Sequence, residues 1–322
     1  MRAIMAEKFG GYENLKAATI PIPTASSGRI LVRVTAAGVT PLDHTILFDK
    51  FPPAKAPLVL GNEGAGIVDQ SGDDEFPNGS RVMFTGPYGV LENGSYSEWL
   101  AVRKEHLCLI PQGVDEAAAG LPIAYLTAFF ALRAAGFQPG KSVLAPAIGG
   151  SVGNAVTQMA RALGARHAIS TTTSHVKAEE ASKLGFSEIV DLSTEGLVEG
   201  VRRLTNGYGA DIVVDGVGGE VLTAALEVLA PGGSLTTLGY AASRKATIDV
   251  ANLIWKRATI KSFSLFAQPA SAWSEAWMAI KELFETGKVK PIVAKTFPLE
   301  HAAEALQYLV ESRPFGRVLI TI

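Results

Sequence analysis

The residues between Ala147 and Gly153 have the types and spacing that hold a phosphate group. They read AIGGSVG, between an apolar run of strand length, 142–147, and a stretch whose apolar residues recur at helical spacing. A glycine turn at a helix start leaves backbone N–H groups free for an anion, which the helix dipole also favours. The strict G-x-G-x-x-G pattern is incomplete, because Ile148 stands where its first glycine is expected.

The same turn also fits G-x-S-x-G, the nucleophile elbow of α/β-hydrolases. Ser151 would then be the nucleophile, with Asp211 or Asp215 and then His301 following in the required order. The chain before Lys141 lacks the alternating strands and helices that a hydrolase sheet needs before its elbow. An esterase therefore remains the alternative reading of this segment.

Composition excludes several classes of protein. The 322 residues carry a net charge of −2 with both signs interspersed, so nothing indicates a nucleic-acid or membrane-surface partner. The single cysteine, Cys108, excludes an internal disulfide and a cysteine-rich zinc site. The N-terminus has no apolar core for a signal peptide, and the apolar run 117–132 is interrupted by Gly120 and Pro122. We expect a soluble, cytoplasmic protein.

The elements that position the glycine turn form an alternating pattern. Residues 1–110 read mainly as β structure, as in a compact irregular barrel, whereas strands and helices alternate from Ser142 to about Phe266. The strands are expected at 142–147, 166–171, 188–190, 210–215, 234–238 and 259–263, with helices at 152–163, 174–184, 195–204 and 219–229. Pro231-Gly232-Gly233 is expected to be a turn that closes one of these helices. This layout predicts a doubly wound, six-stranded parallel sheet.

The tail returns to a mixed pattern, with a helix near 270–286, a strand at 292–296, a helix from Glu300 and a last strand at 317–322. Its strands are expected to rejoin the first domain. The predicted domains are therefore a discontinuous β-rich domain, 1–119 and 267–322, and a nucleotide-binding domain, 120–266.

Several segments in fixed order resemble the medium-chain dehydrogenase/reductase superfamily. They are AAGVTPLD (36–43), PLVLGNEGAG (57–66), GSYSEW (94–99), Leu121-Pro122 with Thr127-Ala128, the glycine turn, VDGVGG (214–219) and PGG (231–233). The resemblance covers essentially the whole chain and is closest to the zinc-free, NADPH-dependent quinone oxidoreductases. It implies a GroES-like catalytic domain beside a Rossmann domain.

The resemblance also bears on metal. Zinc alcohol dehydrogenases carry Cys and His where this chain has Thr40 and Asn62. Hydroxyl and amide groups are poor ligands for Zn²⁺, which prefers thiolate and imidazole. Glu63 survives from the zinc pattern, where it reads as a structural acid. We therefore expect no metal.

The end of the second Rossmann strand bears on the cofactor. NAD enzymes usually place Asp or Glu there to bind the ribose 2′-OH. This chain has STTTSHVK (170–177), with no acid before Glu179. Hydroxyl groups and a cation accept a 2′-phosphate, whereas a carboxylate repels it. In the reductases that it resembles, a Lys at the place of Lys177 contacts this phosphate, so NADPH is the expected cofactor.

By resemblance, a set of side chains is expected to carry the chemistry. Thr40 and Asn62 would line the cleft near the nicotinamide, with Tyr125 and Thr127 close to the cofactor as further catalytic candidates, and Phe51 and Phe263 would contact substrate. Asp43-His44 resembles a catalytic pair, but side chains adjacent on a strand diverge, so we assign it no role. The expected cofactor-binding residues are Thr127, Ile148, Gly149, Gly150, Ser151, Val152, Gly153, Ser170, Thr171, Thr172, Ser174, Lys177, Gly216, Val217, Leu238, Gly239, Tyr240, Phe263, Leu265 and Arg317.

These observations lead to one functional hypothesis. The chain is expected to reduce a quinone or an α,β-unsaturated carbonyl by hydride transfer from NADPH, without zinc. Thr259 to Phe266 alternates as an outer strand does, so a homodimer paired through Rossmann edge strands is expected. The alternatives are an esterase that uses Ser151 and a non-catalytic NADPH-binding protein.

Overall fold

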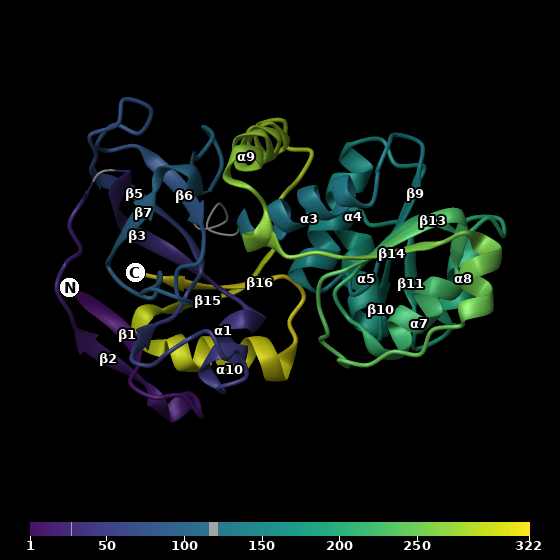
Figure 1. The fold of residues 1–322 in the computed structure, drawn as a ribbon, viewed down its shortest axis with the longest axis horizontal. Helices are drawn as coiled ribbons and strands as arrows, with labels where there is room; N and C mark the ends of the chain where they lie inside the picture. Colours follow the sequence, from purple (N-terminus) through teal and green to yellow (C-terminus); the bar gives the residue numbers. More distant parts are fainter. Residues whose placement is uncertain (27, 116–121) are drawn as a thin grey trace. The chain divides into compact units, whose positions relative to one another are not determined.

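The computed structural model describes residues 1–26, 28–115 and 122–322, which fold into two compact units (Figure 1). Unit 1 comprises Met1–Ile123, Gln268–Glu285 and Pro291–Ile322, and unit 2 comprises Ala124–Ala267 and Thr286–Lys290. The predicted domain boundary between 119 and 120 falls in 116–121, outside the described residues, and stays a prediction.

Unit 1 is built on two β-sheets. The smaller sheet has the order β2-β1-β4, from Leu15–Thr19, Arg2–Ala6 and Leu58–Val59. The larger sheet has the order β15-β16-β3-β5-β6-β8, with β7 also pairing with β3. Its strands are β3 (Arg29–Val39), β5 (Glu63–Gln70), β6 (Arg81–Thr85), β7 (Trp99–Arg103), β8 (Leu107–Leu109), β15 (Val293–Pro298) and β16 (Arg317–Thr321). The predicted return of the C-terminal strands to the β-rich part of the chain is confirmed by β16, which pairs antiparallel with β3.

The register of three neighbouring strands positions a group of polar residues. Val318 of β16 lies opposite Val39 of β3, and Ala37 of β3 lies opposite Gly64 of β5. Antiparallel partners reverse direction, so the start of β16, the end of β3 and the start of β5 lie at the same end of these strands. Arg317, Thr40 and Asn62 lie at this end.

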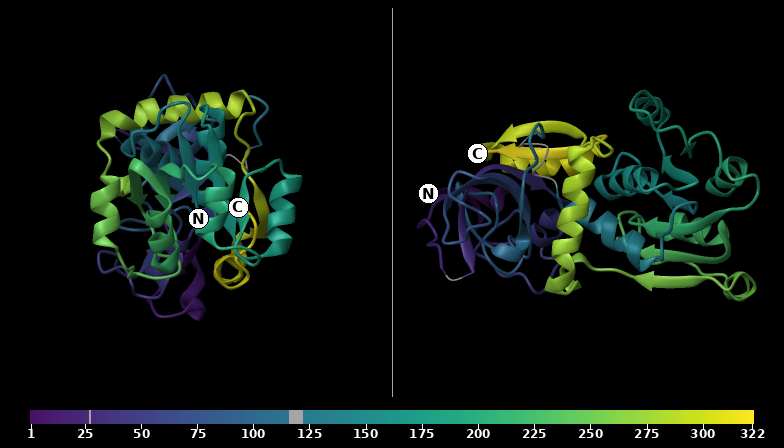
Figure 2. Two further views of the ribbon diagram at one scale, coloured as in Figure 1. Left: turned by 90° about the vertical axis from the view of Figure 1, so that its right-hand side faces the viewer. Right: turned by 90° about the horizontal axis from the view of Figure 1, so that it is seen from above.

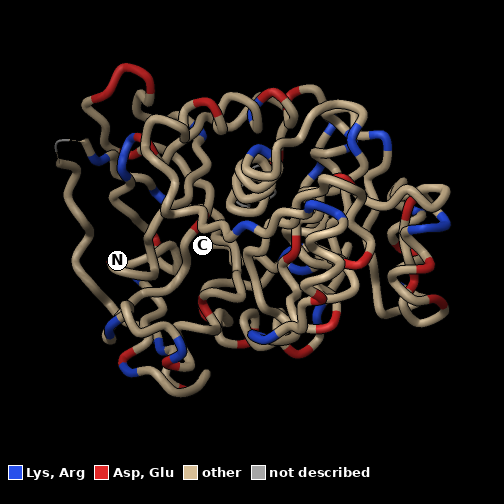
Figure 3. Tube along the Cα trace, turned by 45° about the vertical axis from the view of Figure 1, so that its right-hand side comes forward, with Lys and Arg blue, Asp and Glu red and all other residues tan. Residues whose placement is uncertain are grey.

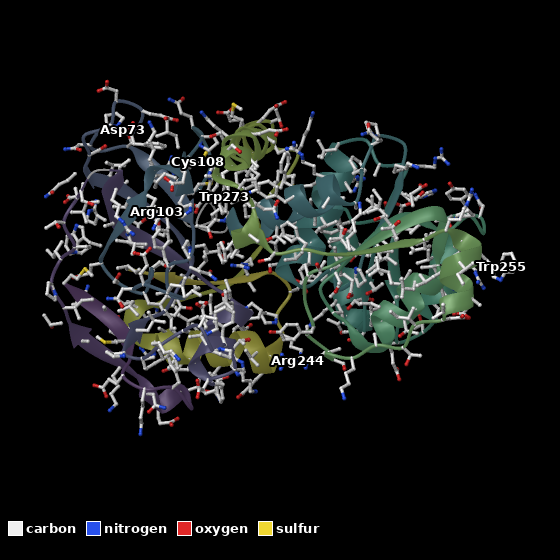
Figure 4. The ribbon with its side chains drawn as sticks, viewed as in Figure 1. Asp73, Arg103, Cys108, Arg244, Trp255 and Trp273 are labelled. Atoms are coloured by element: carbon white, nitrogen blue, oxygen red, sulfur yellow. The ribbon has the colours of Figure 1, made fainter. Side chains whose placement is uncertain are left out.

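Helices cover this sheet on the outside of unit 1. Helix α1 (Pro41–Leu47) and helix α10 (Ala302–Ser312) share one apolar core with the sheets, which includes Ile46, Leu47 and Leu306. Helix α9 (Ala270–Glu285; ribbon in Figure 2) buries Trp273, which is labelled in Figure 4, and Trp277. The Trp277 indole N–H donates to the Glu105 carbonyl. Helix α9 is thus joined to the segment between β7 and β8.

Unit 2 is a doubly wound parallel sheet, as predicted. Its strand order is β11-β10-β9-β12-β13-β14, and all paired neighbours run parallel. The strands are β9 (Ser142–Ala145), β10 (His167–Thr172), β11 (Ile189–Asp191), β12 (Ala210–Asp215), β13 (Leu229–Thr237) and β14 (Thr259–Ser262). The helices are α3 (Pro122–Ala134), α4 (Ser151–Ala162), α5 (His175–Lys183), α6 (Leu197–Leu204), α7 (Gly219–Glu227) and α8 (Val250–Lys256). Strand order reverses between β9 and β12, which is where such sheets bind ligands.

One sequence expectation about this sheet is wrong. Pro231-Gly232-Gly233 does not close helix α7, which already ends at Glu227; it lies inside strand β13. The register of β13 against β12 shifts between Ala210 and Ile212, so these residues form an irregularity of the strand. Gly and Pro residues are common both in strand irregularities and in turns, so the local sequence does not distinguish these two structures.

The surface agrees with the composition. Figure 3 shows Lys and Arg interspersed with Asp and Glu along the trace. Among the described residues, no helix is long and apolar enough to cross a bilayer.

Candidate active site

The glycine turn of unit 2 has the geometry of an anion-binding site. Ala147 adopts a left-handed conformation with φ of 68°, its N–H donates to Thr171 Oγ1, and the Ile148 N–H donates to the Thr171 carbonyl. Helix α4 then begins at Ser151, and no side chain caps it at Gly150. The first N–H groups of a helix have no partner inside the helix, so this end is open to a negatively charged group.

Gly153 is required by the close approach of α4 to the turn. A Cβ at this position would lie 2.4 Å from the carbonyl oxygens of Pro146 and Ala147. The predicted packing role of this glycine therefore has a steric basis. At Gly150 a Cβ would lie 3.2 Å from the Ala147 oxygen, so this position is less crowded.

The residues predicted to bind the 2′-phosphate, at and after the end of strand β10, fall into two groups: those whose hydroxyls already bond within the protein, and Ser174 with Lys177. The Ser170 hydroxyl donates to the Ala145 carbonyl at 2.5 Å, and Thr171 accepts from Ala147, so both hydroxyls serve the sheet. Thr172 is buried, and its hydroxyl accepts from the Ser174 N–H. Ser174 is half-buried and precedes helix α5 without capping it through its side chain. Lys177 follows one turn later, half-buried.

The structure brings two titratable residues together at the carboxyl end of this sheet, which the sequence does not indicate. His175 Nδ1 lies 2.8 Å from Asp191 Oδ2, and Asp191, at the end of β11, also accepts from the Ser193 hydroxyl. The hydrogen bond to Asp191 raises the pKa of His175, and the Ser193 and His175 contacts lower the pKa of Asp191. The two residues are far apart in sequence, and only the register of parallel strands brings them together.

The remaining predicted residues of unit 2 gather at the carboxyl ends of its strands. A Cβ on Gly239 would lie 2.6 Å from the Gly216 oxygen, so the chain after β13 runs tightly over the chain after β12. Asp215 accepts from the N–H groups of Val217 and Gly218 and fixes that turn. Leu238 follows β13 directly, and Tyr240 is 53% exposed.

Helix α3 carries the candidates Tyr125 and Thr127, and the candidate Phe263, just after β14, contacts another residue of the same helix. Tyr125 and Thr127 are buried on α3, and burial raises the pKa of Tyr125, whose hydroxyl bonds to Gln158 of α4. The rings of Phe130 and Phe263 stack with centroids 6.5 Å apart. Leu265 is buried just beyond Phe263.

Unit 1 holds a second constellation, a buried polar cluster made of Thr40, Asp43, Asn62, Glu63 and Arg317. Thr40 begins helix α1 with a reciprocal capping box: its N–H and hydroxyl both donate to Asp43 Oδ2 at 2.8 Å. The Tyr96 hydroxyl donates to the same oxygen at 3.2 Å, and the Gly61 N–H donates to Oδ1 at 3.1 Å. Asp43 is thus the centre of the cluster.

From the sequence, Asp43 is expected on a strand and has no expected role. The structure places it in helix α1, 1% exposed, with its neighbour His44 stacked on Phe48. Burial raises the pKa of Asp43, and its four hydrogen bonds oppose that rise. Thr40-Pro41-Leu42-Asp43 has capping-box spacing with Pro at the first helical position, a signal that could have identified it.

Asn62 is fully buried, and neither its Oδ1 nor its Nδ2 has a hydrogen-bond partner among the described residues. Its backbone is held firmly, because its carbonyl accepts from Thr85 Oγ1 at 2.8 Å. The next carbonyl, of Glu63, accepts from Ser95 Oγ at 2.7 Å. Buried amides are normally satisfied, so an orphaned one points to a ligand that completes it.

Glu63 and Arg317 form an ion pair in the interior of unit 1. Glu63 Oε2 also accepts from the Ile123 N–H at 2.8 Å. Burial lowers the pKa of Arg317 to about 10, although the charge of Asp43 opposes this. Arg317 was predicted to contact cofactor; within unit 1 its charge is offset by Glu63, while its Nε has no partner among the described residues.

Two further expectations concern substrate and metal. Phe51 is half-buried and packs against the core of unit 1 that contains Ile46 and Leu47. Within 1–26, 28–115 and 122–322, no group of three or more His, Cys, Asp or Glu side chains is arranged to hold a metal ion. At the positions of the usual zinc ligands, the Thr40 hydroxyl bonds to Asp43 and Asn62 offers a neutral amide.

The esterase alternative lacks its triad. Asp211 lies at the amino end of β12 and accepts from Lys141 and from the Ser142 N–H. Ser151 follows the carboxyl end of β9, so the two residues lie at opposite ends of the strands. Asp215 binds backbone N–H groups, and His301 Nδ1 contacts Glu304. None of these contacts gives Ser151 a base.

Comparison with known proteins matches this arrangement. The model of the alcohol dehydrogenase GroES-like domain matches residues 26–112, and the model of the zinc-binding dehydrogenase matches residues 151–282. A 2-haloacrylate reductase of a Burkholderia species is 30% identical over 99% of this chain and 98% of its own length. The chain belongs to the medium-chain dehydrogenase/reductase superfamily, in its zinc-free quinone oxidoreductase branch.

Two other members of the superfamily are similar over their full length. The quinone oxidoreductase of Rattus norvegicus is 29% identical over 100% of this chain and 98% of its own length. The solved structure of Escherichia coli quinone oxidoreductase complexed with NADPH has a TM-score of 0.88 at 26% identity and covers 100% of both chains. The superfamily member described here is thus an oxidoreductase with a GroES-like and a Rossmann-like unit.

Proposed function

We propose that this protein is an NADPH-dependent reductase of a quinone or of a carbon–carbon double bond conjugated to a carbonyl, acting without zinc. The observation that carries the proposal is the start of helix α4, which no side chain caps and which Gly153 allows to pack tightly against the glycine turn. The NADPH in the similar E. coli structure and the names of the two reductase relatives support it.

The residues present fit NADPH. The N–H groups at the start of α4 would hold the diphosphate, and Ser174 and Lys177 would hold the 2′-phosphate. No carboxylate ends strand β10, and the nearby Asp191 is bonded to His175. NADPH is therefore favoured over NADH at this end of the sheet.

When bound, NADPH supplies a hydride, which is two electrons and one proton. For an enone that hydride would go to the β-carbon, which would leave negative charge on the carbonyl oxygen until a proton from solvent is taken up at the α-carbon. The protein's own contribution is to hold the reactant and to stabilise the charge that develops on that oxygen. The polar cluster of unit 1 is the candidate for this contribution.

The test begins with fluorescence titration of the purified protein with NADPH and NADH in parallel, followed by turnover of 1,4-benzoquinone and 2-cyclohexen-1-one. Tighter binding of NADPH and turnover that persists after exhaustive chelation are expected. Binding without turnover of any quinone or enone would instead identify a non-catalytic NADPH-binding protein. Loss of turnover on chelation that zinc restores would overturn the metal-free proposal.

We also propose that two copies pair through the edge of the Rossmann sheet, in the cytoplasm. Strand β14 is the last strand in the order, so its outer backbone groups face no strand within the sheet of the described chain. Helix α8, which precedes β14 in the chain and packs against β13, exposes Val250, Ile254 and Trp255, at 63%, 66% and 84%, and Trp255 is labelled in Figure 4. Apolar side chains gathered beside an open edge are typical of an interface.

A further inference from the structure

We infer that the side-chain amide of Asn62 is the hydrogen-bond donor to the carbonyl oxygen of the substrate, and that Thr40 cannot take this role because its hydroxyl hydrogen is held by Asp43. The inference rests on the proposed function and assigns the group that stabilises the developing negative charge.

The Thr40 hydroxyl has one hydrogen, and its position is determined by Asp43. Thr40 Oγ1 lies 2.8 Å from Asp43 Oδ2. A backbone N–H donates to each oxygen of this carboxylate, from Thr40 to Oδ2 and from Gly61 to Oδ1. Because the two backbone donors cannot turn away and, with the Tyr96 hydroxyl, favour a carboxylate that accepts, the Thr40 hydroxyl is placed to donate inward and offers a ligand only a lone pair.

The other hydroxyl groups around the cluster also donate their hydrogens to acceptors within the protein. Tyr96 donates to Asp43, Thr85 donates to the Asn62 carbonyl, and Ser95 donates to the Glu63 carbonyl. Each of these three is fully buried. A substrate oxygen that enters this region therefore finds no spare hydroxyl hydrogen on them.

Two kinds of donor remain in the cluster, the Asn62 amide and the Arg317 guanidinium. Arg317 already has Glu63 as its counter-charge, and its other orphaned donor is Nε. Asn62 is neutral, wholly buried, and has both amide atoms without a partner. A ligand oxygen that accepts from Nδ2 would relieve the desolvation of this group, whereas Arg317 would have to leave Glu63 or turn its Nε.

The position of Asn62 supports the same role. It lies between Gly61, whose N–H is fixed by Asp43, and Glu63, whose side chain is fixed by Arg317 and Ile123. Its own carbonyl is fixed by Thr85. A donor carried on a backbone held on both sides is preorganised and needs no rearrangement as charge develops.

The experiment compares Asn62→Leu, Asn62→Asp and Thr40→Val, with Asn206→Asp as a control that introduces the same charge at an exposed turn. Both Asn62 variants should lose about 10²–10³-fold in kcat, as when one oxyanion donor is removed. Thr40→Val should lose less than either of them. The Kd for NADPH, measured by fluorescence, should stay within about threefold in every variant, which also shows that the variants are folded.

A second readout does not depend on turnover. 2-Cyclohexen-1-one is bound to the wild-type protein together with NADP⁺, which carries no hydride, and its carbonyl stretching band is recorded by infrared difference spectroscopy. A hydrogen bond to the oxygen lowers this frequency. The band should be lowered in the wild type and in Thr40→Val, and should return to the value of the free carbonyl in Asn62→Leu.

Several results would overturn the inference. These are an unshifted band in the wild type, a shift that Thr40→Val abolishes and Asn62→Leu keeps, or a shift that only Arg317→Lys removes. A wild type that binds NADPH but turns over neither an enone nor a quinone would refute the proposed function itself. The two failures are thus distinguished by the wild-type activity.

Discussion

The carboxylate of Glu63 and the guanidinium of Arg317 pair inside unit 1 with side-chain exposures of 0% and 7%. One residue begins strand β5 and the other begins strand β16, near the end of the chain. The pair therefore ties the last strand to the middle of the sheet beside Asn62. Each side chain is the counter-charge of the other in a site where water is scarce.

Removing one member of this pair should destabilise the protein strongly. Glu63→Gln leaves a buried positive charge without its partner, and a loss of about 3–5 kcal/mol in the free energy of unfolding is expected. Urea denaturation measures it. Glu300→Gln, which removes an ion pair with the exposed Arg2, is the control and should cost less than about 1 kcal/mol. Equal effects of the two substitutions would refute the importance of burial.

Gly153→Ala should weaken both folding and cofactor binding. The added Cβ meets two carbonyl oxygens at 2.4 Å, so helix α4 must move away from the turn. A loss of about 1–3 kcal/mol in stability and at least a tenfold rise in the Kd for NADPH are expected. Gly72→Ala, where a Cβ meets nothing within 4 Å, is the matched control. Unchanged NADPH affinity would show that the turn does not bind the diphosphate.

Lys177→Met should change cofactor choice. A charge-assisted contact with the 2′-phosphate contributes about 1.5–3 kcal/mol, so NADPH affinity should fall about tenfold or more while NADH affinity stays constant. Lys183→Met, at the other end of helix α5, controls for the loss of charge. If the affinities for NADPH and NADH fall equally, Lys177 acts by stabilising helix α5 and not by contacting the 2′-phosphate.

The pair of His175 and Asp191 should give unit 2 a pH-dependent stability. The pKa of His175 is raised above 6.5, so its contribution is complete below that pH and is lost as pH rises through the folded-state pKa. The pKa of Asp191 is lowered below 3.8, so its contribution is present above that pH and is lost as pH falls further. NMR titration of His175 should show the raised pKa, and Asp191→Asn should return it toward 6.5. A titration unaffected by Asp191→Asn would contradict the pairing.

Trp255→Lys should abolish the proposed dimer. The side chain is 84% exposed in one copy, and a charge at its place would be buried in the interface. Light scattering should give the mass of a dimer for the wild type and of a monomer for the variant. Leu91→Lys, a 67% exposed site in unit 1, is the control. A monomeric wild type would refute the edge-to-edge model.

Most of the Rossmann unit could be predicted from the sequence because its signals are local, although helix α8 was not predicted and Pro231-Gly232-Gly233 was wrongly expected to be a turn. The strand at 210–215 was predicted with the observed bounds, and the helix predicted at 152–163 is α4, Ser151–Ala162. A buried strand and an amphipathic helix each have their own period, and the glycine turn joins them. Arg317 was found only through its resemblance to a basic position, and its burial with Glu63 depends on strands that are far apart in the chain.

The polar cluster of unit 1 shows why the rest could not be predicted. Thr40 and Asn62 were proposed from the positions of absent zinc ligands, without any indication of their partners. Asp43 was dismissed because a strand was assumed where a capped helix begins. Which hydroxyl hydrogen is already in use depends on Gly61 and Tyr96, and no local pattern contains that information.

The arrangement of unit 1 around the strand β16 has a consequence for synthesis of the chain. Strand β3 is made early, but its neighbour β16 emerges only after all of unit 2. Until then, residues 36–39 of β3, which pair with β16, lack that partner strand, and Glu63 lacks Arg317 as its counter-charge. Unit 2 is a nearly continuous segment and can fold as soon as it leaves the ribosome. The GroES-like part is therefore completed last, and a nascent chain halted before Arg317 would present an unprotected edge to chaperones.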